Sequence, residues 1–326
     1  MSYRQPAEWM PHSAVWIGFP SDESLWLEDL EPAQREVIAF AKAVYAEGAG
    51  EKVFLVAAHE EAAQKARQLI GEAAEVICHN FGDIWLRDSG PIFIANEQEK
   101  AVALFRFNGW GNKYDLEGDQ TIGKALAADT GLSILEKDWV LEGGSIDNDG
   151  HGLVVTTEEC LLNPNRNPDL SREDIALRLK NDLGFDQILW LKKGLLNDHT
   201  DGHVDNLARF VGFKHLVIPI AADESDPNRD IYEEATRSAV DLGIKVTRLP
   251  SPGKITLDEE IVPASYMNFY IGNAVVVVPL YDAKNDKAII KALAPLFPDR
   301  QIIGLPAHHI LTGGGSFHCI SQQWPA

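Results

Sequence analysis

The sequence predicts an α/β fold built from five comparable units. Segments with the hydrophobic pattern of strands alternate with segments of helical spacing along nearly the whole chain, as is typical of α/β proteins. Chemically unusual residues recur near strand ends at Asp88, Glu142, Asp205, Asn268 and Cys319, which are 54, 63, 63 and 51 positions apart. A near-constant interval indicates repeated units. Five such units around a central axis would bring these residues to one pocket.

The N-terminal half supplies the clearest alternation. Apolar residues at helical spacing after Pro32, which suits a first helical turn, predict a helix over 32–47. Further helices are expected over 60–70 and 119–128. The strands expected here cover residues 14–20, 52–57, 75–78, 83–91, 101–107, 139–142 and 151–160. In the strand over 83–91, Asp88 would point to the apolar side, which indicates either pairing with an arginine or a functional role.

The C-terminal half repeats the pattern. Ser171, with Asp174 three residues on, is a suitable N-cap for a helix. Gly272-Asn273 is a turn that tolerates positive φ, so residues 264–279 should form a pair of strands. The other expected elements are strands over 209–220, 245–249 and 301–305 and helices over 230–242 and 286–297.

Composition limits the classes of function. The 326 residues are 45% hydrophobic and carry a formal charge of −20, which argues against nucleic acid as a partner and favours a small cation. Neither a membrane-spanning run nor the apolar core of a signal peptide is visible, so we expect a cytoplasmic protein with no membrane partner. Three scattered cysteines suit neither a disulfide framework nor a zinc cluster, and Cys78 and Cys160 are expected to be buried strand residues.

Three motifs carry ionisable groups beside glycines or in dense clusters. Residues 313–319 place three glycines before Cys319, which is either a nucleophile or a small buried hydrophobic residue. Glu142 precedes Gly-Gly, which clears space beside a charge or simply forms a tight turn. Residues 197–206 are densely polar, and His203 and Asp205 would point the same way if this segment were extended.

The polar segment also raises a metal-dependent alternative. His199 and His203 have the spacing of zinc ligands on a helix, but the intervening Thr-Asp-Gly argues against a helix. A metal-dependent hydrolase that uses His199, His203 and His318 therefore stays an alternative, as does a binding protein without catalysis.

Taken together, the chain resembles the family of agmatine deiminases and bacterial-type peptidylarginine deiminases, which modify guanidines. Six motifs in order carry this resemblance: Trp85-Leu-Arg-Asp-Ser-Gly-Pro91, Phe107-Asn-Gly-Trp-Gly111, Glu142-Gly-Gly-Ser145, Glu158-Glu-Cys-Leu-Leu-Asn-Pro-Asn-Arg166, Thr200-Asp-Gly-His-Val-Asp-Asn206 and Gly313-Gly-Gly-x-x-His-Cys-Ile320.

The resemblance implies a five-bladed, pentein-like α/β propeller that forms a single domain over residues 1–326. It implies that Cys319 attacks the guanidinium carbon, that His203 is the acid–base, and that Asp88 and Asp205 clamp the guanidinium nitrogens. Trp85 is similar to the family's aromatic contact beside the substrate. No metal and no organic cofactor is expected.

The same resemblance implies the reaction. Agmatine and water would give N-carbamoylputrescine and ammonia, a step towards putrescine, and free or peptide-linked arginine is the alternative substrate. Trp110 and Glu142 are further candidates for substrate binding, and the loop around Trp110 is a candidate lid. The sequence does not determine whether the chain forms a homo-oligomer.

Departures from the family's pattern leave the substrate open. His199 stands where a glutamate is frequent, Ser316 where asparagine is frequent and Asp147 where histidine is frequent. If His199 faces the far end of the ligand, the case for a terminal amine is weaker. Arg87 and Arg106 are candidate partners for a substrate carboxylate, or members of structural ion pairs.

Overall fold

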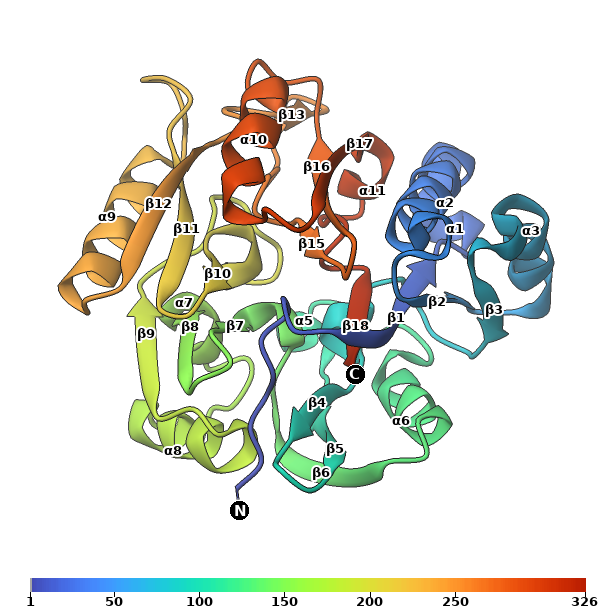
Figure 1. The fold of residues 1–326 in the computed structure, drawn as a ribbon, viewed down its shortest axis with the longest axis horizontal. Coiled ribbons are helices and arrows are strands. Elements are labelled where there is room, and N and C mark those ends of the chain that lie inside the picture. The colour runs from blue at the N-terminus through green and yellow to red at the C-terminus, as the bar shows by residue number, and fades with distance from the viewer. Residues whose placement is uncertain (1) are drawn as a thin grey trace.

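Five small β-sheets surround the centre of the molecule in the computed structural model, which describes residues 2–326 (Figure 1). In each sheet an inner strand pairs antiparallel with one neighbour and parallel with the other. Each parallel pair is joined by a crossover that contains a helix, because parallel strands cannot be joined by a tight turn. The five units predicted from residue spacing therefore correspond to five sheets.

The first sheet joins the two ends of the chain, because the C-terminal strand β18 pairs with β1. Its strand order is β18-β1-β2-β3, with β18 at Ser321–Pro325, β1 at His12–Phe19, β2 at Lys52–Ala57 and β3 at Glu75–Cys78. Its helices are α1 at Glu23–Trp26, α2 at Leu30–Tyr45 and α3 at Glu60–Ile70.

The other four sheets have three strands each, in the sequence order of their strands. They are β4-β5-β6 at Ile92–Ala95, Lys100–Arg106 and Ser133–Val140; β7-β8-β9 at Ile146–Asn148, Leu153–Thr157 and Gln187–Leu191; β10-β11-β12 at Arg209–Gly212, His215–Ile220 and Lys245–Pro250; and β15-β16-β17 at Tyr270–Ile271, Val275–Leu280 and Gln301–Pro306. A short hairpin pairs β13 at Thr256–Leu257 with β14 at Glu260–Ile261.

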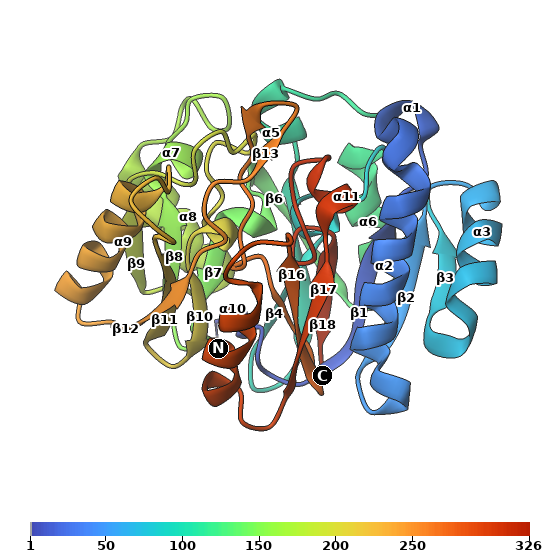
Figure 2. The same ribbon diagram turned by 90° about the horizontal axis from the view of Figure 1, so that it is seen from above.

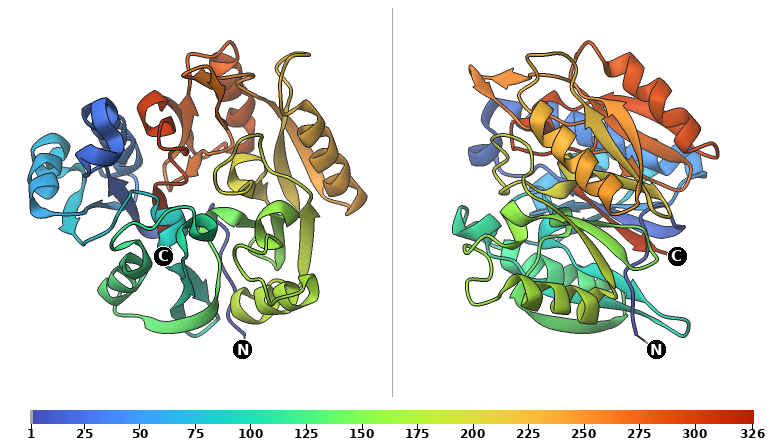
Figure 3. Two further views of the ribbon diagram at one scale, coloured as in Figure 1. Left: turned by 180° about the vertical axis from the view of Figure 1, so that it is seen from behind. Right: turned by 90° about the vertical axis from the view of Figure 1, so that its left-hand side faces the viewer.

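The four longest helices of these units lie at the periphery (Figure 1). The helices of the four units are α4 at Leu86–Ser89, α5 at Gly109–Asn112, α6 at Asp119–Asp129, α7 at Glu158–Leu161, α8 at Arg172–Leu183, α9 at Arg229–Asp241, α10 at Asp286–Leu293 and α11 at His308–Leu311. Figures 2 and 3 show both termini on one face of the molecule, away from α1 and α5. No helix in residues 2–326 is both long enough and apolar enough to span a bilayer.

Most predicted elements are confirmed with small shifts at their ends. The strands over 52–57 and 75–78 and the helix over 60–70 match β2, β3 and α3. Ser171 caps α8, and its side chain and that of Asp174 form a reciprocal capping box. The pair of strands around Gly272-Asn273 is also confirmed as β15 and β16.

The predicted strand over 83–91 is wrong. Residues 82–85 form no strand, and the short helix α4 follows. The reason is that side chains satisfy the backbone N–H groups: Asp119 accepts from Gly82 and Asp83, and the Asp83 carboxylate accepts from Ile84. Backbone N–H groups that donate to side-chain carboxylates do not need the hydrogen bonds of a β-sheet.

Three smaller predictions are also wrong. Residues 209–220 form the hairpin β10–β11 rather than one strand, and Lys214 takes a positive φ of 48° at its turn. Cys160 lies in α7 instead of a strand, because Thr157 ends β8 and caps that helix. Cys78 lies in β3 but is exposed.

Candidate functional site

The five residues singled out by their spacing occupy equivalent places in the five sheets. Each lies in a turn or short helix just before the strand that pairs antiparallel with the inner strand: Asp88 precedes β4, Glu142 precedes β7, Asp205 precedes β10, Asn268 precedes β15 and Cys319 precedes β18. All five are buried. The repeated topology therefore brings residues that are far apart in sequence to the centre of the molecule.

Cys319 is held by two of these residues. The Nδ2 group of Asn268 donates to the Cys319 sulfur at 3.0 Å, and the Asn268 carboxamide oxygen accepts from the backbone N–H of Cys319 at 3.2 Å. Oδ2 of Asp205 lies 3.5 Å from the same sulfur. The thiol is thus fixed between an amide donor and a carboxylate.

Asp88 lies opposite, with its carboxylate oriented by two donors. The indole N–H of Trp110 donates to Oδ2 at 3.0 Å, and the backbone N–H of Gly144 donates to Oδ1 at 2.9 Å. Among the described residues no arginine lies within ion-pair distance of Asp88, and its only ion-pair contact is with His203 at 3.6 Å. The structural explanation of a buried Asp88, pairing with an arginine, therefore fails.

Gly144 shows how closely the charged groups converge. A Cβ atom at this position would lie 2.7 Å from His203 Nδ1, 2.8 Å from Asp88 Oδ1 and 3.1 Å from Asp205 Oδ2. Distances below 3.0 Å are not tolerated by real Cβ atoms, so only glycine fits here. The Gly-Gly sequence after Glu142 therefore does more than form a turn, because it lets three ionisable groups meet.

His203 lies beneath Asp88 with only 1% of its surface exposed. Its Nε2 atom is 3.6 Å from Glu142 Oε2, and Glu142 is held in turn by Arg166 Nε at 2.9 Å. Burial alone would lower the pKa of His203, but the charge of Asp88 and the contacts with Cys160 and Glu142 raise that pKa well above its ordinary value. The surroundings of His203 therefore favour its protonated form.

The pKa values of the thiol and of the two carboxylates are not all shifted in the same direction. Burial, followed by the charges of Asp205 and Asp88, raises the pKa of the Cys319 thiol well above its ordinary value. Burial also raises the pKa of Asp88. Burial would raise the pKa of Asp205 as well, but the hydrogen bond with His318 leaves it lowered. The site without a ligand thus favours a protonated Cys319.

A pocket of about 210 Å³ leads to Cys319. Its walls are largely aromatic and small residues, and they comprise Leu25, Asp83, Trp85, Asp88, Trp110, Tyr114, Leu116, His199, Thr200, Asn206, Thr312, the glycines 313–315 and Cys319. A Cβ atom at Gly315 would lie 2.6 Å from the Trp85 ring and 3.1 Å from the Cys319 sulfur. The glycine run therefore lets the Trp85 indole lie close to Cys319 in the pocket.

A second layer of charges supports this centre, and the sequence analysis did not find it. The His318 ring bridges Asp205 Oδ2 at 2.7 Å and Glu8 Oε2 at 2.8 Å. Arg209 binds Glu8 at 2.8 Å and Asp147 at 2.7 Å. Glu8 lies in the N-terminal segment, in which no motif or strand pattern marks it, so the sequence offered no signal for its role.

Some predicted residues take the places expected of them and others do not. Glu142 does not line the pocket and lies behind His203. Trp110 lines the pocket, as a substrate-binding candidate should, and its buried indole donates to Asp88. His203 and Asp205 do converge, although Asp205 lies in a 3-10 turn instead of an extended segment.

The residues considered for metal or carboxylate binding are dispersed. His318 is engaged by Asp205 and Glu8, whereas His199 lies at the pocket wall with Nδ1 3.3 Å from the Tyr114 hydroxyl. Within the described part of the chain, the histidines at 199, 203 and 318 do not form a common ligand cluster. Arg87 is buried and donates to Gln322 and Gln323, and Arg106 ends β5 as an exposed residue.

Comparison with known proteins identifies the family. The model of the Porphyromonas-type peptidyl-arginine deiminase family matches residues 4–325. The chain belongs to this family.

As a member of the Porphyromonas-type peptidyl-arginine deiminase family, the chain is also similar to solved agmatine deiminases. That of Enterococcus faecalis is 30% identical with a TM-score of 0.94, over 99% of this chain and 96% of the other. A cysteine-to-serine variant of the C. jejuni enzyme with substrate bound is 31% identical with a TM-score of 0.93, over 99% and 96%. A Mycoplasma capricolum protein, provisionally named as an agmatine deiminase, is 36% identical over 98% of this chain and 95% of its own. These similarities show a single-domain α/β fold of the agmatine deiminase type.

Proposed function

We propose that this protein is a cysteine-dependent deiminase that converts agmatine and water into N-carbamoylputrescine and ammonia. The observation that carries the proposal is the position of the Cys319 sulfur. It lies 3.5 Å from Asp205 Oδ2, at a pocket that Asp88, Trp85 and Trp110 also line. Two solved relatives of similar fold are agmatine deiminases. In this proposal the five sheets are the blades of a propeller whose axis holds the site.

Asp88 and Asp205 bind the guanidinium. A guanidinium is planar and presents paired N–H donors, so two carboxylates on either side fix the position of its carbon. Oδ1 of Asp205 is buried and has no hydrogen-bond partner in residues 2–326, which is costly for a carboxylate unless a ligand donates to it. The indole of Trp85 supplies a flat wall for the cation.

The chemical steps follow from the position of the sulfur. The bound cation favours loss of the Cys319 proton to solvent, and the thiolate attacks the guanidinium carbon to form a C–S bond. A C–N bond then breaks, and the nitrogen leaves as ammonia after it accepts a proton. Water attacks the resulting thiouronium carbon, which breaks the C–S bond and yields the ureido product and the free cysteine.

His203 is the group that moves these protons. Its raised pKa favours the protonated form of the imidazole. The group that protonates the leaving nitrogen must start in this form. After ammonia has left, the neutral imidazole can take a proton from the attacking water. Glu142 acts behind it as a positioning residue, because Glu142 contacts His203 and Arg166 but does not line the pocket.

The pocket favours agmatine over free arginine. No lysine or arginine is found among the described residues that line it, so a substrate carboxylate would have no cationic partner. Lys113, which lies nearby, is engaged by Asp201 and by the backbone carbonyl of His199. A reaction that needs a free thiol also suits a reducing compartment, which supports a cytoplasmic enzyme.

The test is a colorimetric assay of ureido product on agmatine, free arginine and a peptide with a C-terminal arginine. We expect turnover of agmatine to exceed that of both arginine substrates. Cys319→Ser should abolish turnover while the unfolding transition stays unchanged. Turnover that persists in Cys319→Ser would overturn the proposed nucleophile, and preference for an arginine substrate would overturn the proposed substrate.

A further inference from the structure

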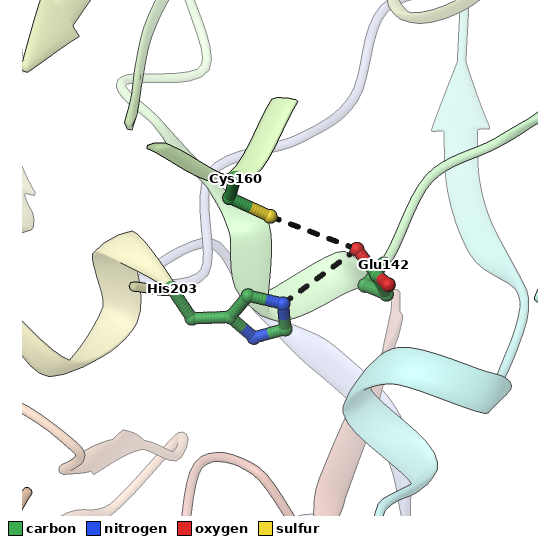
Figure 4. Close-up of side chains that lie close together, drawn as sticks. All are labelled: Glu142, Cys160 and His203. Carbon is green, nitrogen blue, oxygen red and sulfur yellow. Dashed lines mark hydrogen bonds and ion pairs between the residues drawn. The ribbon is translucent and has the colours of Figure 1, made fainter. Parts of the chain in front are cut away.

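Three potential metal ligands from three different segments meet behind the pocket: Glu142, Cys160 and His203 (Figure 4). Cys160 Sγ is 3.8 Å from Glu142 Oε2, and His203 Nε2 is 3.6 Å from the same oxygen. All three ligand atoms lie within 4.8 Å of one another, and all three residues are buried. The mechanism proposed above makes no use of Cys160.

The imidazole of His203 points to a ligand at this place. Neither of its nitrogens has a hydrogen-bond partner in residues 2–326, although the residue is 1% exposed. The gap of 3.6 Å to Glu142 is longer than a hydrogen bond. Buried polar atoms are almost always paired, so an unpaired ring nitrogen directed at a carboxylate and a thiol has room for a shared partner.

Two of the three spacings are close to those around a tetrahedral ion. Bonds of about 2.0 Å to nitrogen and oxygen and about 2.3 Å to sulfur place N and O about 3.3 Å apart and S and O about 3.5 Å apart. The observed separations exceed these values by about 0.3 Å each, which small side-chain shifts can close. We propose that Glu142, Cys160 and His203 form a binding site for Zn²⁺ or a similar thiophilic divalent cation.

The chemistry of the donors selects the class of metal. Thiolate and imidazole ligands favour Zn²⁺ or Co²⁺ over Mg²⁺ and Ca²⁺, which prefer oxygen ligands. Arg166 binds the other oxygen of Glu142 at 2.9 Å and so orients the carboxylate towards the cluster, in the manner of outer-shell partners of known metal sites.

The charges of the ligands suit a divalent ion in a buried place. When they bind a metal, Cys160 is a thiolate and Glu142 is a carboxylate, so their two negative charges balance the two positive charges of the ion, and the neutral imidazole of His203 adds none. No additional buried charge therefore has to be paired.

Occupation of this site would inhibit the enzyme reversibly. A metal-bound His203 is a neutral imidazole whose remaining N–H is a far weaker acid than an imidazolium, so it protonates the leaving nitrogen poorly, whereas Cys319 stays free of metal. The expected inhibition rests on the role proposed above for His203. Metal binding itself does not depend on that role. The two ideas can therefore be separated by a spectroscopic test that needs no turnover.

The experiment adds Co²⁺ to the Cys319→Ser protein, which lacks the nucleophilic thiol, and records the near-ultraviolet charge-transfer band of a cobalt–thiolate bond. Because the cluster is buried, each sample is incubated until the signal is constant. We expect a band that Zn²⁺ displaces and that persists after the matched Cys78→Ala substitution at an exposed cysteine. Adding Cys160→Ala instead should remove the band and weaken Co²⁺ binding at least about 100-fold.

The outcomes are distinct. A band in the wild-type protein that disappears in Cys319→Ser places the metal on Cys319 and overturns the proposal. Loss of the band with Cys78→Ala, or the absence of any band, also overturns it. Thermal unfolding checks that Cys160→Ala folds, and Cys160→Val replaces it if it does not. Zn²⁺ inhibition, measured against each variant's own metal-free rate, should weaken with Cys160→Ala. If the protein shows no turnover, the cobalt band still tests the site.

Discussion

A bound guanidinium should make the Cys319 thiol far more acidic than it is in the free enzyme. The perturbation is addition of a guanidine that binds without turnover. In the free enzyme the pKa of Cys319 is raised by burial, by Asp205 at 3.5 Å and by Asp88. A cation between the two carboxylates makes the potential at the sulfur less negative, so the pKa of Cys319 falls.

The size of the effect follows from the distances in the site. Attack requires the guanidinium carbon about 3–3.5 Å from sulfur. A unit charge at about 4 Å contributes about 4 kcal/mol at an effective dielectric constant of about 20, which corresponds to a pKa lower by about 3 units. The two carboxylates are present in both states and do not enter the difference, whereas water in the pocket screens the cation, so we expect a decrease of about 2–3 units.

The assay is the ultraviolet absorbance of the thiolate, titrated against pH with and without the guanidine. Cys319→Ser serves as the blank, because it retains Cys78, Cys160 and all the tyrosines. The difference between the two proteins reports Cys319 alone. An apparent pKa that does not change when the guanidine binds would refute the reasoning, since the cation would then not lie beside the sulfur.

Three further predictions test the surroundings of the site. In the proposed mechanism His203 gives its proton, so kcat should fall as pH rises through its raised pKa. Glu142→Gln removes an anion 3.6 Å away and should move this fall at least about one unit lower, and a pH–rate profile that does not move would contradict this expectation. Arg209→Met removes the buried ion pairs with Glu8 and Asp147 and should lower the free energy of unfolding by about 3–5 kcal/mol, measured by urea denaturation. An unchanged midpoint would count against a structural role. Burial raises the pKa of Asp83 to about 6, and this carboxylate accepts the indole N–H of Trp85 at 2.7 Å. Tryptophan fluorescence should therefore change with pH around pH 6, and this change should be absent in Asp83→Asn.

The elements that the sequence predicted well are those whose stability is local or periodic. The helix α3 and the strands β2 and β3 were placed at their observed ends because a hydrophobic period and flanking polar residues define them. The segment over 83–91 failed because its donors are satisfied by Asp119, which lies 36 residues along the chain from Asp83. No pattern within the segment itself could reveal that partner.

The residues of the site can be divided in the same way, into those that the sequence could identify and those that it could not. Asp88, Asp205 and Cys319 could be selected because acidic or nucleophilic residues beside glycines are unusual near strand ends, and the repeat interval required them to meet. Glu8 could not be found, because its role depends on Arg209 and His318, which approach only in the folded molecule. Glu142 was selected correctly as unusual, but its distance from the pocket was beyond what spacing can indicate.

The placement of a nucleophile between two carboxylates has a chemical logic. Thiolates, rather than thiols, react with oxidants and disulfides, so a cysteine kept protonated in the free enzyme is protected from these side reactions. In the proposed mechanism the same carboxylates bind the one kind of ligand whose charge releases the proton. On this proposal the acidic pair couples recognition of a cation to activation of Cys319, and an uncharged isostere of the substrate would gain neither binding nor a nucleophile.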